Sequence, residues 1–284
     1  MVLAMVLGVL IFVVEMIALL CRWSRTKKPK KFEQVEAFLE LHEERATNRY
    51  KYSEVKKMTN FFKDKLGEGG YGSVFKGQLP NGGAMVAVKI LSETKGNGDD
   101  FINELASISK TFHRKLITYL GYCVDRGRRA LIYEFMPNGS LEKYIYYKVS
   151  AKAQSRLGLM TLYNIAIGIA DGLQYLHEGG VSRKADVYSY GKMLLEMAGG
   201  RKIFDVQTET YYPPWIYDKL VANENLELYG ITTPEEELTA LKMILVGLWC
   251  IQTDPAVRPY MSEVVQMLKG SLDTVPIPPR PSSI

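Results

Sequence analysis

The segment from residue 66 to residue 89, LGEGGYGSVFKGQLPNGGAMVAVK, constrains the fold of this chain more than any other part of the sequence. Gly67, Gly69 and Gly72 stand at the spacing GxGxxG. Glycines at this spacing let a backbone close over phosphate groups, because they lack side chains and accept φ values that other residues resist. The spacing alone is weak evidence for any one fold. Dinucleotide-binding folds also use it, with a strand before the glycines and a helix after them.

The residues after the glycines predict a β-hairpin instead. Residues 73–79 continue as a strand, residues 80–83 (PNGG) form a turn, and residues 85–91 form a second apolar strand. In the second strand Ala87 and Lys89 share a face, because side chains alternate with a period of two. A small residue and an amine therefore point to the same side of a predicted phosphate-covering hairpin.

The composition is that of a folded protein. The chain has 284 residues with 47% hydrophobic content, which is enough for a large core and predicts one or two domains. Its three cysteines, Cys21, Cys123 and Cys250, are widely spaced and odd in number. They therefore form neither a disulfide framework nor a CxxC metal site, and a reducing compartment is expected.

The net charge of +5 comes from one short segment of the chain. Six of the 36 lysines and arginines lie between Arg22 and Lys31, which leaves 30 against 31 acidic residues in the rest of the chain. The globular part is thus near neutral. This balance argues against a nucleic-acid-binding surface and for a basic patch close to a membrane.

Residues 2–21 are almost continuously apolar and long enough to cross a membrane. Twenty residues in a helix span roughly 30 Å, the thickness of a hydrocarbon core. A cleaved signal peptide or a buried core helix is the alternative, but the run lacks a basic start and is too long for a signal peptide. The basic residues 22–31 follow at once, so the positive-inside rule places the rest of the chain in the cytosol, with the basic run near anionic lipid.

Further elements are predicted downstream of the hairpin. Residues 101–110 predict a helix with Glu104 in its middle, and residues 117–123 and 129–135 complete an antiparallel sheet of five strands. The other predicted helices have apolar residues at helical spacing or a capping residue at their start: residues 52–62 with Ser53 as N-cap, a short helix capped by Ser140, and residues 162–177, 186–198, 238–250 and 260–269. The proline-rich end is predicted to be a solvated tail.

The glycine-rich hairpin, Val74 and the VAVK strand together resemble the ATP-binding lobe of a protein kinase. From about residue 52 to residue 281 the chain is similar to the cytosolic half of plant receptor-like protein kinases of the leaf-rust-resistance and thaumatin-like types. The stretches RYKYSEVKKMTNFF, RALIYEFMPNGSL and ADVYSYGKMLLEMAGGR carry this likeness. The resemblance implies a single-pass receptor of the plasma membrane whose cytosolic domain transfers the γ-phosphate of ATP to serine or threonine residues of proteins in signalling.

The resemblance also implies a nucleotide site on the sheet and on the hinge that follows it. Glu104 is implied as the helix glutamate that pairs with Lys89. Tyr133 is implied as the gatekeeper, with the backbones of Glu134 and Met136 facing adenine. The full set implied to bind ATP is Leu66, Gly67, Gly69, Gly72, Val74, Ala87, Lys89, Glu104, Tyr133, Glu134 and Met136.

The chain departs from the family between His177 and Asp186. The family has a catalytic loop, a magnesium-binding DFG segment, an activation loop and an APE motif there, and this chain has only EGGVSRKA. By the resemblance about sixty residues are missing, and neither HRD nor DFG occurs in the sequence. Phosphoryl transfer needs the loop aspartate and the metal ligands, so no catalytic residue and no metal ligand is assigned, and magnesium binding is placed in doubt.

Two interpretations remain open. The first is a catalytically inactive chain that retains the ATP site: a pseudokinase that binds partner receptor kinases, or the product of a skipped exon or a faulty gene model. The second is an active kinase whose catalytic loop is not in this sequence.

The shortened segment has two structural consequences for the helical lobe: a short connection must join two helices, and Arg258 needs a new partner. The nine residue steps from His177 to Asp186 reach at most about 30 Å, which can bridge two neighbouring helix ends. The resemblance implies that Arg258 pairs with the glutamate of APE, which is missing here. A buried unpaired arginine is costly, so Arg258 is expected to reach water or to pair anew, with Glu196 or Asp254 as candidate partners.

The sequence therefore predicts an α+β protein with a protein-kinase-like two-lobe fold, a truncated helical C-lobe and an N-terminal transmembrane helix. The expected divisions are a transmembrane helix over 1–21, a basic juxtamembrane linker over 22–51, a kinase N-lobe over 52–136, a truncated C-lobe over 137–272 and a proline-rich tail over 273–284. ATP, membrane lipid and partner receptor kinases are the expected partners, and nucleic acid is not.

Overall fold

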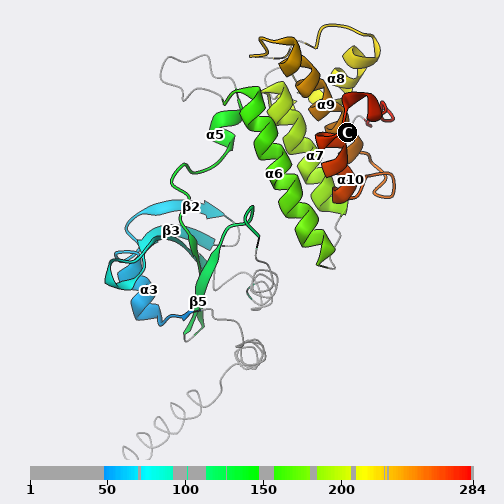
Figure 1. The fold of residues 1–284 in the computed structure, drawn as a ribbon. Helices are drawn as coiled ribbons and strands as arrows, with labels where there is room; N and C mark the ends of the chain where they lie inside the picture. The colour runs from blue at the N-terminus through cyan, green and yellow to red at the C-terminus, as the bar shows by residue number, and fades with distance from the viewer. Residues whose placement is uncertain are drawn as a thin grey trace, which may run out of the picture. The chain divides into compact units, whose positions relative to one another are not determined.

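The computed structural model describes residues 48–69, 72–91, 101, 113–125, 127–146, 157–179, 184–205, 209–226, 228 and 230–282. The chain forms two compact units, a sheet unit that ends at Met136 and a helical unit that contains residues 113–116 and everything after Met136 (Figure 1). Among the described residues, no helix is both long and apolar enough to cross a membrane. The predicted span over 1–21 and the linker up to residue 47 lie outside this part of the chain.

The sheet unit is built on six strands in the order β1-β5-β6-β4-β3-β2. In chain order they are β1 (Asn48–Arg49), β2 (Lys65–Gly69), β3 (Gly72–Gln78), β4 (Met85–Leu91), β5 (Tyr119–Asp125) and β6 (Arg128–Glu134). Strands β2 to β6 are joined by antiparallel pairing, which confirms the predicted five-stranded sheet. The short strand β1 is additional: it pairs in parallel with β5, and it lies in the segment predicted to be a linker.

One face of the sheet is covered by α3 (Tyr52–Met58). Val86 and Val88 of β4 are fully buried and pack in one cluster with Val55 and Met58 of this helix. The side chains between them, Ala87 and Lys89 among them, must therefore point to the opposite face. The predicted sharing of a face by Ala87 and Lys89 is confirmed by this alternation.

Two details of α3 differ from the prediction. The helix begins after Lys51 rather than at Ser53, because the carboxylate of Glu54 accepts the Lys51 amide hydrogen at 2.7 Å and so satisfies the exposed end of the helix. It also ends at Met58, before Phe62. Residues 60–62 have positive φ values of 45°, 57° and 62°, which are incompatible with a continuing right-handed helix.

The helical unit contains six helices within the described residues, with a two-stranded ribbon of β7 (Phe204–Asp205) and β8 (Thr210–Tyr211) and a final 3-10 turn, η2 (Leu272–Thr274). The helices are α5 (Glu142–Ile145), α6 (Leu159–Glu178), α7 (Lys184–Gly199), α8 (Tyr212–Val221), α9 (Pro234–Cys250) and α10 (Met261–Lys269). The four long predicted helices are confirmed as α6, α7, α9 and α10. Ser140 accepts a 3.4 Å bond from the Glu142 amide, although the N-cap of α5 is Leu141, one residue later than expected.

Glycines allow α7 and α9 to pack with their backbones in contact. A Cβ atom added to Gly191 of α7 would lie 2.5 Å from Cys250 Cβ and 2.9 Å from the Gly247 carbonyl oxygen, both on α9. Helix α6 joins this pair through a buried hydrogen bond of 3.0 Å from the Tyr190 hydroxyl to the Ala166 carbonyl oxygen. The three helices surround a core of buried apolar side chains that belongs to the helical unit alone.

The proline-rich tail is largely exposed to solvent, as predicted, but it is docked on the helical unit by specific contacts. The indole of Trp249 donates to the Pro276 carbonyl oxygen at 2.8 Å, and the Gln252 amide donates to the Pro279 carbonyl oxygen at 3.0 Å. Arg280 forms a two-pronged ion pair with Asp218 at 2.7 and 2.8 Å. Proline carbonyls remain good acceptors although proline has no N–H, and they dock the tail onto donors of the helical unit.

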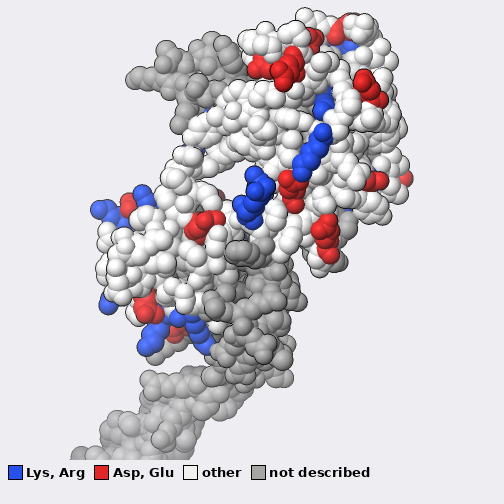
Figure 2. Space-filling view, viewed as in Figure 1, with Lys and Arg blue, Asp and Glu red and all other residues white. Residues whose placement is uncertain are grey.

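The described surface carries charges of both signs. On the face drawn in Figure 2, lysine and arginine side chains are interspersed with aspartate and glutamate side chains over both units.

Candidate functional site

Strand register brings four of the predicted nucleotide-binding side chains to one face of the sheet. Lys89 of β4 lies opposite Val74 of β3, and Ala87 of β4 lies opposite Tyr133 of β6. Residues directly opposite one another in a sheet project to the same side. The face is the one away from α3, and all four side chains are only partly buried there.

The pattern of β3 also brings a residue to this face that the sequence interpretation left out. Lys76 lies opposite Ala87, and its ammonium group sits 5.0 Å from the centre of the Phe135 ring. The sequence does indicate this position, because side chains of a strand alternate and Lys76 is the next residue of β3 after Val74 on the same side. The face therefore presents two ammonium groups, on Lys76 and Lys89.

The three glycines of the GxGxxG spacing have different local roles. Gly67 and Gly69 are exposed in β2, and an added Cβ atom at either position would meet nothing within 4 Å. Gly72 begins β3 with a φ of +137°, and an added Cβ atom would overlap the Ile90 carbonyl oxygen. Only Gly72 is required by the hairpin itself, while Gly67 and Gly69 leave open space beside the backbone of β2.

The remaining predicted positions are found at the start and end of the same sheet. Leu66 is 48% exposed and falls in an irregularity of the β2–β3 pairing, and Met136 is 45% exposed and follows the end of β6. Glu134 is held by Thr118, since its amide donates to the Thr118 carbonyl oxygen at 3.0 Å and its carboxylate accepts from the Thr118 amide at 2.7 Å. Glu104, the predicted partner of Lys89, lies outside the described residues.

The predicted positions combine open space, small side chains and a cation on this face of the sheet. The space beside Gly67 and Gly69 is unfilled, the side chains of Val74 and Ala87 are small, and Lys89 supplies a cation on the same face. Among the described residues, no cluster of three or more histidine, cysteine, aspartate or glutamate side chains is arranged to hold a metal ion. This face of the sheet offers apolar side chains and positive charge.

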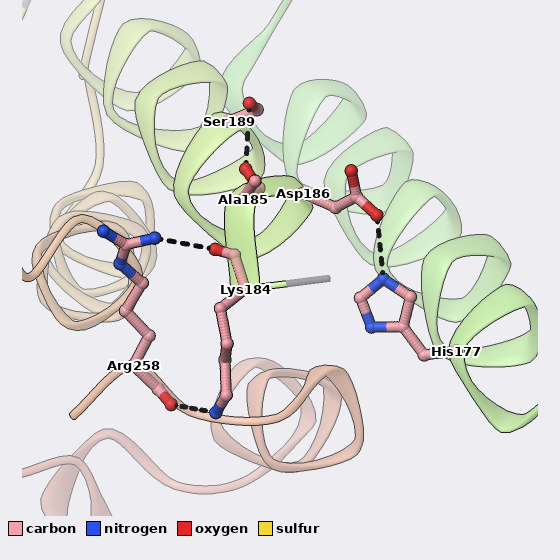
Figure 3. Close-up of polar contacts among 6 residues, drawn as sticks. All are labelled: His177, Lys184, Ala185, Asp186, Ser189 and Arg258. Atoms are coloured by element: carbon pink, nitrogen blue, oxygen red, sulfur yellow. Dashed lines mark hydrogen bonds and ion pairs between the residues drawn. The ribbon is translucent and has the colours of Figure 1, made fainter. Parts of the chain in front are cut away.

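The ends of α6 and α7 meet across the shortened segment. His177, at the end of α6, lies 3.2 Å through its Nε2 atom from Oδ2 of Asp186, in the first turn of α7. Figure 3 shows the imidazole and the carboxylate pointing toward one another. The His177 side chain is only 8% exposed, and its Nδ1 atom is buried without a hydrogen-bond partner. The expected bridging of two neighbouring helix ends is confirmed, and these two residues bind one another.

Arg258 is newly paired, as expected, but not with a carboxylate. Its guanidinium donates to the carbonyl oxygens of Gln252 at 2.6 Å, Lys184 at 2.9 Å and Thr253 at 3.1 Å. The prediction that Glu196 or Asp254 pairs with Arg258 is wrong, since the carboxylates of both residues accept hydrogen bonds from other groups. Glu196 accepts from the Tyr146 hydroxyl at 2.7 Å and the Ile203 amide at 2.9 Å, and Asp254 accepts from the Ala256 amide at 2.8 Å.

The sequence of the chain is similar to those of known protein kinases. A family model described as protein tyrosine and serine/threonine kinase matches residues 61–182, and the match ends inside the segment that joins α6 to α7. The chain is 39% identical to the rust resistance kinase Lr10 of Triticum aestivum over 315 residues, and 38% identical to the PR5-like receptor kinase of Arabidopsis thaliana over 303 residues. These alignments cover 87% and 82% of this chain.

Both alignments are longer than the 284 residues of this chain, so each contains positions where the relative has a residue and this chain has none. The chain spans about half the length of the curated relatives it matches, 49% of Lr10 and 45% of the PR5-like receptor kinase. A shortened kinase domain is consistent with these alignments.

A solved structure agrees on the fold. The pseudokinase DRIK1 (drought responsive inactive kinase 1), in a co-crystal with ENMD-2076, superimposes with a TM-score of 0.65 at 22% sequence identity, covering 79% of this chain and 96% of that chain. The fold is thus the two-lobe fold of protein kinases. The chain carries a truncated protein kinase domain whose homologues are receptor-like kinases of the leaf rust 10 type.

Proposed function

We propose that this chain is a membrane-anchored pseudokinase: it holds ATP on the sheet unit, does not transfer phosphate, and acts in signalling by binding other proteins such as partner receptor kinases. The observation that carries the proposal is the contact between His177 and Asp186, which closes α6 directly onto α7. In the homologous kinases this connection holds the catalytic base and the metal-binding segment, and phosphoryl transfer depends on both.

The nucleotide would be held by the residues that the register gathers on one face. The backbone of Gly67 and Gly69 would cover the phosphates, Lys89 would neutralise their charge, and Val74 and Ala87 would contact the base. Backbone groups of Glu134 and Met136 would face adenine. Because the sequence lacks the DFG aspartate, we expect magnesium to add little to nucleotide affinity.

The anchor is proposed from the apolar run over 1–21 and the basic residues after it. One of the similar proteins is named a receptor kinase and another a receptor-like protein kinase, which supports a membrane location for this chain as well.

A phosphotransfer assay on the full chain in detergent tests the central claim. With Mg-ATP and a generic protein substrate, we expect no phosphate incorporation above background, and no difference between the wild type and Lys89→Met. In a parallel thermal-shift titration, ATP should raise the melting temperature of the wild type but not of Lys89→Met, with or without EDTA. Autophosphorylation that Lys89→Met abolishes would overturn the proposal.

The alternative of an active kinase depends on residues absent from this sequence. Sequencing the transcript across the codons for Gly179 and Gly180 decides between them. A transcript with about sixty additional codons at this point, as the homologous catalytic segment requires, would favour the active kinase, and a continuous junction would favour the pseudokinase.

A further inference from the structure

A second site is suggested by a pocket within the helical unit. The pocket has a volume of about 310 Å³ and is lined by Arg258 together with four side chains that carry a hydroxyl group, Tyr188, Tyr211, Thr253 and Ser282. None of its lining residues is acidic. The hydroxyl groups bond to one another in two pairs, Thr253 with Ser282 at 2.9 Å and Tyr211 with Tyr188, so the guanidinium is the charged group that the pocket offers to an anionic ligand.

The guanidinium of Arg258 is fixed in position but not saturated. Of its five N–H groups, three donate to the carbonyl oxygens of Gln252, Lys184 and Thr253. One N–H group on each terminal nitrogen remains. The guanidinium carbon also lies 4.8 Å from the centre of the Tyr188 ring, so the plane is supported from one side. These two remaining N–H groups can donate to the oxygens of an anion.

The charge of this region is also uncompensated. Lys184 donates from its ammonium group to the Arg258 carbonyl oxygen and lies 3.8 Å from the centre of the Tyr260 ring. Within the described part of the chain, neither Lys184 nor Arg258 has a carboxylate partner. The nearest acid on α7, Asp186, points toward His177 on the other side of the helix from Arg258 (Figure 3). The guanidinium of Arg258 therefore has no acidic partner within the described residues.

From this geometry we infer that the pocket binds a carboxylate, borne either by a small organic acid or by a glutamate or aspartate side chain of another protein. The second source rests on the proposed role as a protein-binding module. A singly charged carboxylate fits better than a phosphate, because Arg258 is the one charged residue that lines the pocket and the Lys184 side chain does not line it.

Saturation-transfer NMR on the full chain tests this inference with defined probes. The probes are succinate, N-acetylglutamate N-methylamide, and the matched glutamine compound, which lacks the charge. We expect a signal from the carboxylate probes about fivefold above that of the glutamine compound. A stronger signal from the capped glutamate than from succinate assigns the ligand to a protein side chain, and the reverse order assigns it to a free acid. Equal signals from the glutamate and glutamine compounds, or displacement by an equal concentration of inorganic phosphate, would overturn the inference.

Variants locate the site. Arg258→Met should abolish the signal, but it also removes three hydrogen bonds that support the fold. The double variant Tyr211→Phe, Ser282→Ala therefore provides a milder test, since it removes two hydroxyl groups from the pocket and leaves Arg258 in place. We expect it to lower the signal about threefold, with a smaller shift of the unfolding curve than Arg258→Met causes, because it removes only the bonds to Thr253 and Tyr188. Ser189→Ala is the matched control, because this hydroxyl lies on the exposed side of α7 and bonds only to the Ala185 carbonyl oxygen.

A signal that survives both Arg258→Met and the double variant would place carboxylate binding elsewhere and refute the assignment. This outcome is independent of the proposed function. A chain that binds the carboxylate and also transfers phosphate would overturn the pseudokinase proposal alone.

Discussion

The sheet unit and the helical unit are held together in different ways. In the sheet unit, hydrogen bonding in a single register places Val74, Ala87, Lys89 and Tyr133 on one face, so the site depends on every strand between them. In the helical unit, α6, α7 and α9 pack through apolar side chains, and the chain between α6 and α7 is only residues 179–183. A helical unit can therefore lose a long connection between two helices, whereas this sheet cannot lose a central strand without losing its site.

The crossing of α7 and α9 is where the helical unit should be most sensitive. Gly191→Val adds a branched side chain where a Cβ atom would already lie 2.5 Å from Cys250 Cβ. We expect the free energy of unfolding to fall by about 3 kcal/mol, because two helix backbones in contact cannot easily move apart. Urea denaturation followed by circular dichroism measures the change.

Gly158→Ala is the matched control, since an added Cβ atom there meets nothing within 4 Å. Its effect should stay below about 0.5 kcal/mol. If Gly191→Val were as stable as the wild type, helix packing would not be what holds this unit, and the contrast with the sheet unit would fail.

Two glycines of the hairpin should have different roles: Gly72 supports the structure, and Gly69 faces the proposed ligand. Gly72→Ala forces a side chain into a backbone with a φ of +137° and onto the Ile90 carbonyl oxygen, so we expect a loss of about 2 kcal/mol in stability. Gly69→Ala meets no atom within 4 Å and should leave stability nearly unchanged while weakening ATP binding. Chemical denaturation and an ATP thermal-shift titration on both variants provide the two readouts. Equal stability losses would contradict the assignment of separate roles.

The junction between α6 and α7 should contribute the least. A double-mutant cycle with His177→Phe and Asp186→Asn isolates the contact between the two side chains, and we expect a coupling energy of about 1 kcal/mol, the value of one ordinary hydrogen bond. A coupling near zero would mean that the helix ends meet only because their packing brings them together. A coupling above about 3 kcal/mol would make the junction, rather than the α7–α9 crossing, the main support of the helical unit.

The sequence was sufficient where a structure follows from a local pattern. Period-two alternation and turn residues located β3 and β4 within one residue, and helical periodicity located α6, α7, α9 and α10. Helix α8 was missed because Pro213 and Pro214 suggest a loop, although prolines are tolerated in the first turn of a helix, where they lie.

Features that depend on distant residues could not be read from the sequence. Strand β1 has two residues and exists only through its pairing with β5, and the partners of Arg258 are backbone carbonyl groups, which have no signature in the sequence. The candidate nucleotide face was accessible because its residues follow the alternation of two strands. The pocket beside Arg258 was not, because Tyr188, Tyr211 and Ser282 come from three separate segments of the chain.

The short connection between α6 and α7 also bears on the order in which the chain folds. Shortening a loop from about sixty-five residues to five lowers the entropic cost of closing it by roughly 2 kcal/mol, because each doubling of length costs about 0.6 kcal/mol. The buried bond from Tyr190 to Ala166 then joins residues 24 positions apart, so α6 and α7 form a local helical hairpin. Local contacts form early and fast. During synthesis this hairpin can close before α9 has left the ribosome, and it then provides a preformed surface onto which Gly247 and its neighbours dock.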